Sequence, residues 1–126
     1  MAAAELDSLA SEQFCYLTTR GRRTGLPREI EIWFGLDCGT LYMLSGGRDR
    51  SDWVRNILAD PNVTVRIGDN EFAGQGRAVE EATGEDALAR RLLLDKYSSS
   101  YSGDLTDWGR TALPVAVELQ VAVSVD

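Results

Sequence analysis

A turn dense in arginine is the part of this sequence best suited to bind a ligand. Residues 20–28, RGRRTGLPR, contain four arginines, two glycines and one proline. Arginine side chains match the geometry of phosphate and carboxylate groups, and glycines let backbone N–H groups approach an anion. The segment therefore predicts an anion-binding turn. The alternative is a basic turn that only faces solvent.

A second candidate is the glycine-rich loop at residues 45–53, SGGRDRSDW. Gly46 and Gly47 come shortly before an expected helix, and a helix N-terminus is a natural place for an anion to bind. The loop matches neither the Walker A motif nor the G-x-G-x-x-G motif of dinucleotide-binding proteins. By itself it is also compatible with an ordinary connection. Together with the arginine turn, it favours convergence of both segments on one ligand.

Several aromatic side chains are candidates for stacking on a flat ring. Core packing is the alternative explanation for each of them, and it is the expected one for Trp53. Trp33 is out of step with the apolar residues of its expected strand, which predicts that it faces a pocket. Tyr97 and Tyr101 flank a serine-rich stretch and are candidates for a mobile lid. The full set is Trp33, Tyr42, Trp53, Tyr97, Tyr101 and Trp108.

The residue types that are missing narrow the chemistry. The sequence contains no histidine, which removes the commonest zinc ligand and the commonest general base. Cys15 and Cys38 lack the spacing of a metal or redox motif and are expected to be free thiols. No metal site is predicted and no catalytic residue can be named. Any chemistry is expected to depend on a cofactor, a carboxylate, a tyrosine or a thiol.

Charge and length limit the classes of protein. The chain has 126 residues and a net charge of −7, which predicts one domain over residues 1–126 and argues against nucleic acid as a partner. Seven of the 13 basic residues nevertheless fall between positions 20 and 55, a distribution that favours a small anionic ligand. No apolar run approaches the roughly 18–20 residues of a membrane span, and no signal peptide is evident. A cytoplasmic protein is expected.

The elements expected around these residues are mostly strands. Turn residues separate neighbouring strands, which favours hairpins and antiparallel pairing, and a closed barrel would remove exposed strand edges. The predicted fold class is therefore mainly β (α+β), with six antiparallel strands in a barrel and two main helices. Alternating or β-branched segments predict strands at residues 14–19, 28–34, 40–44, 63–67, 71–80 and 113–125.

The first main helix is expected next to the glycine-rich loop. Ser51 is its expected N-cap, and the helix is expected over residues 52–58. Its apolar spacing predicts that Trp53, Ile57 and Leu58 face inward.

The second main helix is expected to start at Thr83 and to run to about Tyr97, with acidic residues in its first turn, where they suit the helix dipole. A short leading helix is also expected over residues 5–13. Residues 98–109 are polar and are expected to form a loop or a short irregular helix.

Four stretches taken together resemble a known family. They are LTTRGRRTGLPR at residues 17–28, LSGG at 44–47, SDWVRN at 51–56 and DPNVTV at 60–65. In this combination the chain is similar to the deazaflavin-dependent nitroreductases, actinobacterial proteins of the wider flavin reductase and pyridoxamine-phosphate-oxidase-like class. It departs from their pattern in carrying Glu29 and Glu31 at positions that are often uncharged.

The resemblance implies a split β-barrel, often dimeric, that binds coenzyme F420 in a groove. It implies hydride transfer from the reduced coenzyme to a small-molecule acceptor, which is a quinone, a nitroaromatic or an activated enone. Arg22 and Arg23 are implied to contact the phosphate and glutamate tail. Trp33, Tyr97 and Tyr101 are implied on the substrate side. The implied cofactor-binding residues are Arg22, Arg23, Pro27, Leu44, Ser45, Gly46, Gly47, Ser51, Trp53, Arg55 and Asn56.

Two alternatives stay open on the sequence. One is a reductase of the same fold that uses FMN in place of F420. The other is a non-enzymatic protein that binds a cofactor or another ligand without turnover. The charges of the sequence do not distinguish F420 from FMN, because both cofactors carry a phosphate.

Overall fold

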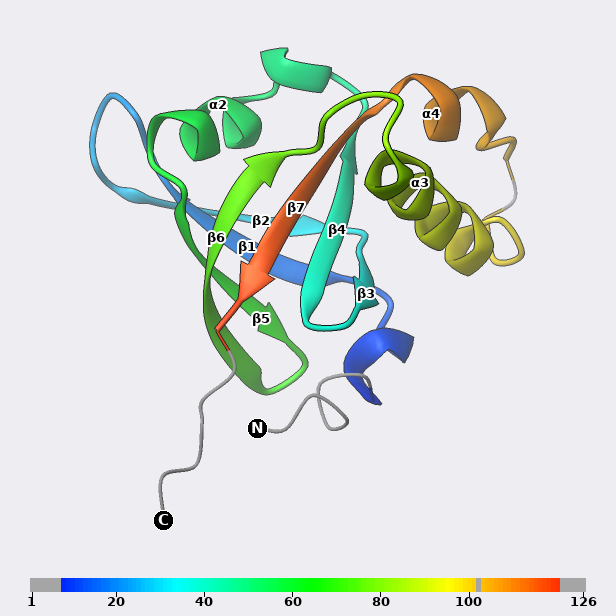
Figure 1. The fold of residues 1–126 in the computed structure, drawn as a ribbon. Coiled ribbons are helices and arrows are strands. Elements are labelled where there is room, and N and C mark those ends of the chain that lie inside the picture. Colours follow the sequence, from blue (N-terminus) through cyan, green and yellow to red (C-terminus); the bar gives the residue numbers. More distant parts are fainter. Residues whose placement is uncertain (1–7, 102, 121–126) are drawn as a thin grey trace.

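The computed structural model describes residues 8–101 and 103–120. Within these residues the chain forms one curled antiparallel sheet of seven strands in the order β2-β1-β5-β6-β7-β4-β3, a half-barrel with helices at its ends and on one face (Figure 1). The strands are β1 (Cys15–Arg20), β2 (Pro27–Ile32), β3 (Gly35–Asp37), β4 (Thr40–Ser45), β5 (Asn62–Ile67), β6 (Asn70–Ala78) and β7 (Leu113–Leu119). The helices are α2 (Asp52–Ala59), α3 (Gly84–Tyr97) and α4 (Thr106–Thr111), with short 3₁₀ segments η1 (Ser8–Ser11) and η2 (Arg48–Arg50).

The predicted antiparallel sheet is confirmed, but the number of strands was wrong. One strand was expected over residues 28–34, and the chain instead forms β2, a corner at Trp33 and Phe34, and then β3. β2 pairs with β1, where Ile32 lies opposite Cys15, whereas β3 pairs with β4. Alternation within a sequence does not reveal that a chain changes its partner strand, so the break was not predicted.

This corner also connects the two edges of the half-barrel. β2 and β3 are the two edge strands of the sheet, yet only Trp33 and Phe34 separate them in the chain. The two edges are therefore brought together at one point. The side chains of this corner lie where the sheet curls round on itself.

The core has two parts because one half of the sheet is covered on both faces. The inside of the curl holds apolar side chains such as Leu17, Val65 and Val117. Across β4 and β7, α3 packs on the opposite face with Leu93 and Tyr97 (Figure 1). A strand buried on both faces reads as a continuous apolar run, which explains the unbroken burial at the start of β7.

α2 agrees with the expected range but differs in detail. Val54 and Ile57 are buried, and Trp53 packs against the core, whereas Leu58 is 58% exposed and does not face inward. Ser51 precedes the helix but its side chain does not cap it. The helix approaches β6 closely, because a Cβ at Gly76 would lie 2.9 Å from a methyl group of Ile57.

The C-terminal half contains one more helix than expected. α3 starts next to Thr83 as predicted, and Thr83 is its N-cap, with its hydroxyl accepting the Asp86 N–H at 3.1 Å. The segment expected as a loop or irregular helix contains α4. η1 stands where a leading helix was expected, and residues 5–7 of that helix and 121–125 of the last strand lie outside the described residues. None of the helices within the described ranges is long and apolar enough to cross a membrane.

Candidate functional site

The arginine turn is a compact loop that connects β1 to β2. The Gly21 N–H donates to the Leu26 carbonyl at 2.8 Å, and the Gly25 N–H donates to the Gly21 carbonyl at 2.7 Å. Gly25 has φ of +73°, a conformation that glycine adopts without steric cost. The local sequence therefore shapes the turn by itself, as the two glycines suggested.

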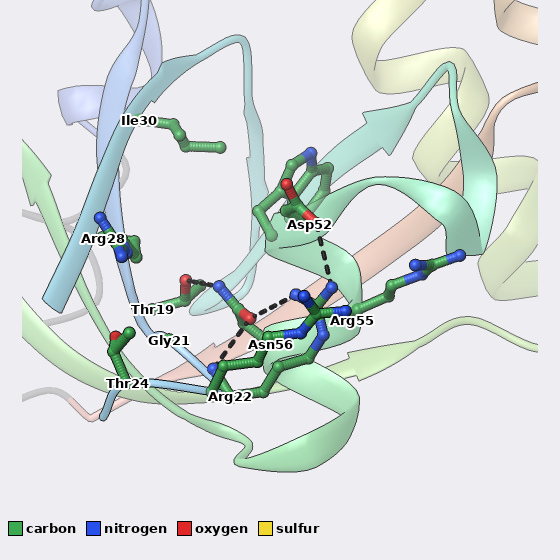
Figure 2. Close-up of a pocket in the computed structure, with 11 residues that line it drawn as sticks. Thr19, Gly21, Arg22, Thr24, Arg28, Ile30, Asp52, Arg55 and Asn56 are labelled. Atoms are coloured by element: carbon green, nitrogen blue, oxygen red, sulfur yellow. Dashed lines mark hydrogen bonds and ion pairs between the residues drawn. The ribbon is translucent and has the colours of Figure 1, made fainter. Parts of the chain in front are cut away.

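Asn56 of α2 fastens this turn to the body of the protein. Its side chain is buried, and its amide oxygen accepts hydrogen bonds from Arg22, one from Nη1 at 2.9 Å and one from the backbone N–H at 3.2 Å. Its Nδ2 donates to Thr19 Oγ1 at 3.1 Å. Figure 2 shows this amide between Thr19 and Arg22. Asn56 therefore positions the turn, and its amide oxygen is occupied by the two donors of Arg22.

The turn and α2 enclose a hollow that is rich in positive charge. It has a volume of about 520 Å³ and is drawn in Figure 2. Four of its lining residues are arginines and one, Asp52, is an acid. We call it the basic hollow, and its lining residues are Thr19, Gly21, Arg22, Arg23, Thr24, Arg28, Ile30, Asp52, Trp53, Arg55 and Asn56.

The four arginines differ in how far the protein already uses them. Arg22 is bound to Asn56 and forms an ion pair with Asp52 at 3.1 Å. The Arg55 side chain donates one hydrogen bond, from Nε to the Asp49 carbonyl at 3.2 Å. The guanidinium groups of Arg23 and Arg28 make no hydrogen bond or ion pair with any residue that the structure describes. Their guanidinium groups are the ones most available to an anion.

A second hollow of about 510 Å³ is lined mainly by aromatic and aliphatic side chains. Trp33 contacts Tyr101 and Trp108 edge to face, with ring centroids 5.6 and 5.8 Å apart. Glu31 and Asp104 are the charged groups among its described lining residues. We call it the aromatic hollow, and its lining residues are Phe14, Glu31, Ile32, Trp33, Leu44, Tyr101, Asp104, Leu105 and Trp108.

The two hollows adjoin along one face of β2. Ile30 lines the basic hollow and Ile32 lines the aromatic hollow. Residues two apart in a strand point to the same side, so the hollows follow each other along that face. Together they offer an elongated site with cationic groups at one end and flat rings at the other.

The sequence-predicted residues divide among several places. Arg22, Arg23, Trp53, Arg55 and Asn56 line the basic hollow. Leu44, Trp33 and Tyr101 line the aromatic hollow. Segments of the chain that are far apart in sequence are thus brought together at each hollow. These residues stay proposed ligand contacts, with Asn56 also positioning Arg22.

Other predicted residues lie outside both hollows. Pro27 lines a third hollow of about 440 Å³, beside Arg20 and Asp60, which form an ion pair at 3.4 Å. In the glycine-rich loop, Ser45 and Ser51 line neither hollow, and their hydroxyls share a hydrogen bond of 2.9 Å. Gly46 lies beside the Trp108 ring. The remaining predicted residue of this loop, Gly47, lines neither hollow either.

Tyr97 is placed differently from the expectation of a mobile lid. Its ring is fully buried and stacks on Trp33, with centroids 4.2 Å apart and planes 3° from parallel. Burial raises the pKa of the Tyr97 phenol to about 12. Tyr97 therefore packs against Trp33 and does not line the aromatic hollow, whereas Tyr101 lines it and is 47% exposed.

Several residues that line the hollows were not predicted from the sequence, because their residue types do not by themselves indicate a binding site. Thr19 and Ile30 join the basic hollow through strand alternation, Thr24 through the arginine turn and Asp52 through the first turn of α2. Phe14, Glu31, Ile32, Asp104 and Leu105 join the aromatic hollow. The alternation of β2 could have placed Ile30 and Ile32 on the face that also carries the site.

The sequence of this chain is similar to those of known reductases. A family model described as F420H(2)-dependent quinone reductase matches residues 3–120. F420H(2)-dependent quinone reductase Rv1261c of Mycobacterium tuberculosis is 26% identical over 105 residues, which cover 80% of this chain and 68% of the relative.

Solved structures share the fold. An F420-H2-dependent reductase, FDR-A, is similar with a TM-score of 0.68 and 24% identity, covering 84% of this chain and 94% of that one. The conserved protein Rv2991 of Mycobacterium tuberculosis is similar with a TM-score of 0.71 and 21% identity, covering 97% of this chain and 81% of that one.

Proposed function

Since the chain belongs to the F420H(2)-dependent quinone reductase family and is an F420-dependent reductase, we propose that its groove holds the coenzyme tail at the basic hollow and its ring toward the aromatic hollow. The observation that carries this orientation is the separation of charge along β2. Arginines line one end, and aromatic rings with two carboxylates line the other. An anionic tail is attracted to the first end and repelled by the second.

The residues of the basic hollow suit the tail, which carries a phosphate and glutamate carboxylates. Hydrogen bonds between arginine and such anions are charge-assisted and often bidentate. Arg23 and Arg28 have their guanidinium groups free of partners among the described residues, and Arg22 is held in place by Asn56. In this proposal Arg23 and Arg28 supply most of the attraction, and Arg22 fixes the shape of the turn.

The aromatic hollow suits the redox step. The reduced coenzyme supplies the hydride when it is bound. Trp33, Tyr101 and Trp108 provide flat apolar surfaces against which a planar ring can stack, and these surfaces exclude water from the reacting faces. The chain needs no histidine for this task.

The proton that completes the reduction comes, in this proposal, from water or from Tyr101. Tyr97 does not supply it, because its hydroxyl already donates inside the protein, to the Gln13 carbonyl at 2.8 Å. The raised pKa of its phenol also makes it a poor acid near neutral pH.

The acceptor is proposed to be a flat, conjugated molecule: a quinone, a nitroaromatic or an activated enone. The rings of the aromatic hollow provide the stacking surface, and no arginine or lysine is among its described lining residues. Neutral acceptors therefore suit the hollow better than anionic ones. Self-association as a homodimer and a cytoplasmic location stay predictions.

Two measurements test the proposal. Fluorescence titrations with F420 and with FMN should show tighter binding of F420, and tighter binding of FMN would overturn the cofactor placement. The protein with reduced F420 should then oxidise it in the presence of menadione, a nitroaromatic or a cyclic enone. Binding of F420 with no oxidation across that panel would contradict the proposed acceptors and favour a protein that only binds the cofactor.

A further inference from the structure

The corner between β2 and β3 is held by the end of α3. The backbone groups of Trp33 and Phe34 belong to neither strand ladder. The ladder of β2 with β1 ends at Ile32, and the ladder of β3 with β4 begins at Gly35. Polar backbone groups in a buried corner need partners from elsewhere. Phe34 is fully buried, so its amide must be satisfied within the protein.

Two consecutive residues of α3 supply these partners. The Phe34 N–H donates to the Tyr97 hydroxyl at 3.0 Å. The Phe34 carbonyl accepts from Lys96 Nζ at 3.0 Å and lies 3.1 Å from the Tyr97 hydroxyl. The Lys96 ammonium also sits 3.6 Å from the centroid of the Phe34 ring. The peptide is thus bound on both its donor and its acceptor side.

The same tyrosine fixes the neighbouring indole. Tyr97 stacks parallel on Trp33 at 4.2 Å and thereby covers one face of that ring. Trp33 lines the aromatic hollow, so only the part of the indole ring that Tyr97 leaves uncovered can face that hollow. The Tyr97 side chain therefore contacts both the backbone of Phe34 and the ring of Trp33.

We propose that Tyr97 and Lys96 are positioning residues, which hold the Phe34 peptide and so fix Trp33 as a rigid wall for the flat acceptor. This inference rests on the proposed function, in which the aromatic hollow takes the acceptor. Neither residue touches the acceptor. Their effect passes through Trp33, whose indole moves when the corner is released.

Three variants separate the parts of this unit. Tyr97→Phe keeps the stacking ring and removes both hydroxyl contacts with Phe34. Lys96→Met keeps the length of the side chain and removes the donor, and Lys96→Arg restores a donor. We expect the acceptor KM to rise at least fivefold in the first two variants, with kcat changed less than twofold, and Lys96→Arg to recover most of the loss. The Kd of F420 should change less than the acceptor KM, since the arginines of the basic hollow supply most of the attraction for the coenzyme.

A spectroscopic measurement tests the positioning without turnover. In a chain with Trp53→Phe and Trp108→Phe, Trp33 is the last of the three tryptophans. Its near-ultraviolet circular dichroism should weaken, and its acrylamide quenching should increase, when Tyr97→Phe or Lys96→Met is added. Unchanged spectra in both variants would overturn the inference.

Controls distinguish this inference from the proposal on which it rests. Val79→Ala, a buried truncation that lines neither hollow, should lower stability without changing the acceptor KM. If Trp33→Ala leaves the acceptor KM unchanged, the acceptor does not use this hollow and the proposed function fails there. If Trp33→Ala raises KM but Tyr97→Phe and Lys96→Met do not, the acceptor placement holds and the positioning inference is wrong.

Discussion

Asn56 Oδ1 accepts two hydrogen bonds from Arg22, one from the guanidinium at 2.9 Å and one from the backbone N–H at 3.2 Å. The two residues are 34 positions apart in the chain, and this contact joins the arginine turn to α2. Removing this buried amide would leave its partners unpaired and lower the free energy of unfolding. The site therefore depends on an asparagine that offers little to a ligand directly.

Asn56→Ala is expected to destabilise the protein and loosen the turn. Removing the amide leaves the Arg22 N–H and the Thr19 hydroxyl without their partner, which costs about 1–3 kcal/mol. We expect a lower free energy of unfolding in urea and a weaker affinity for F420. Asn62→Ala, at an exposed asparagine that bonds Asp60, is the control and should change stability by less than about 0.5 kcal/mol. Equal stability of Asn56→Ala and the parent would contradict the role of this contact.

Arg23→Ala and Arg28→Ala are expected to weaken F420 binding without lowering stability. Each removes a guanidinium that has no partner among the described residues, so only the ligand contact is lost. The loss of one charge-assisted hydrogen bond corresponds to about 1.5–3 kcal/mol, or roughly a 10- to 100-fold higher Kd. Arg22→Ala should lower both affinity and stability, because Arg22 also binds Asn56 and Asp52. Fluorescence titration and urea unfolding of the three variants check this pattern, and an unchanged Kd in all three would refute the placement of the tail.

Glu31→Gln and Asp104→Asn are expected to relax discrimination against anionic acceptors. Hydrogen bonds from Thr106 hold the pKa of Asp104 below its ordinary value, so this carboxylate is charged at neutral pH. Each variant should raise kcat/KM for a sulfonated naphthoquinone relative to menadione by roughly two- to fivefold, as expected for exposed charges. Added salt should reduce the difference. Glu29→Gln, on the same strand but in neither hollow, should leave the ratio unchanged, and an equal change there would point to a general effect of net charge.

Lys96→Met is expected to change how stability depends on pH. Burial lowers the pKa of Lys96 to about 8 from an ordinary value of 10.5, against the opposing charges of Cys15 and Glu12. Between those values the unfolded chain binds more protons than the folded one, so this lysine makes stability rise with pH. The free energy of unfolding of the parent minus that of Lys96→Met should therefore increase from pH 7 to pH 10. Taking this difference cancels most of the opposite trend from Cys15, whose pKa burial raises to about 12. A difference that stays flat or falls over this range would contradict the lowered pKa.

The sequence predicted what depends on neighbouring residues. The alternation of residues 63–67 and the Thr83 cap of α3 were found where expected, because strand pleating and helix capping act over a few positions. The arginine turn was also predicted, since its two glycines and its proline determine the local backbone. An anionic ligand at this turn was predicted from the density of arginines.

The use of each side chain depends on contacts that the local sequence does not specify. Trp33 and Tyr97 are both aromatic and 64 positions apart, and the sequence gives no sign that one stacks behind the other. Likewise Arg22, Arg23 and Arg28 are equivalent as residue types, but Asn56 and Asp52 from α2 bind the first and leave the other two available. Burial and pairing are determined by contacts between distant segments, and such contacts exist only once the sheet has curled and its two edges have met at Phe34.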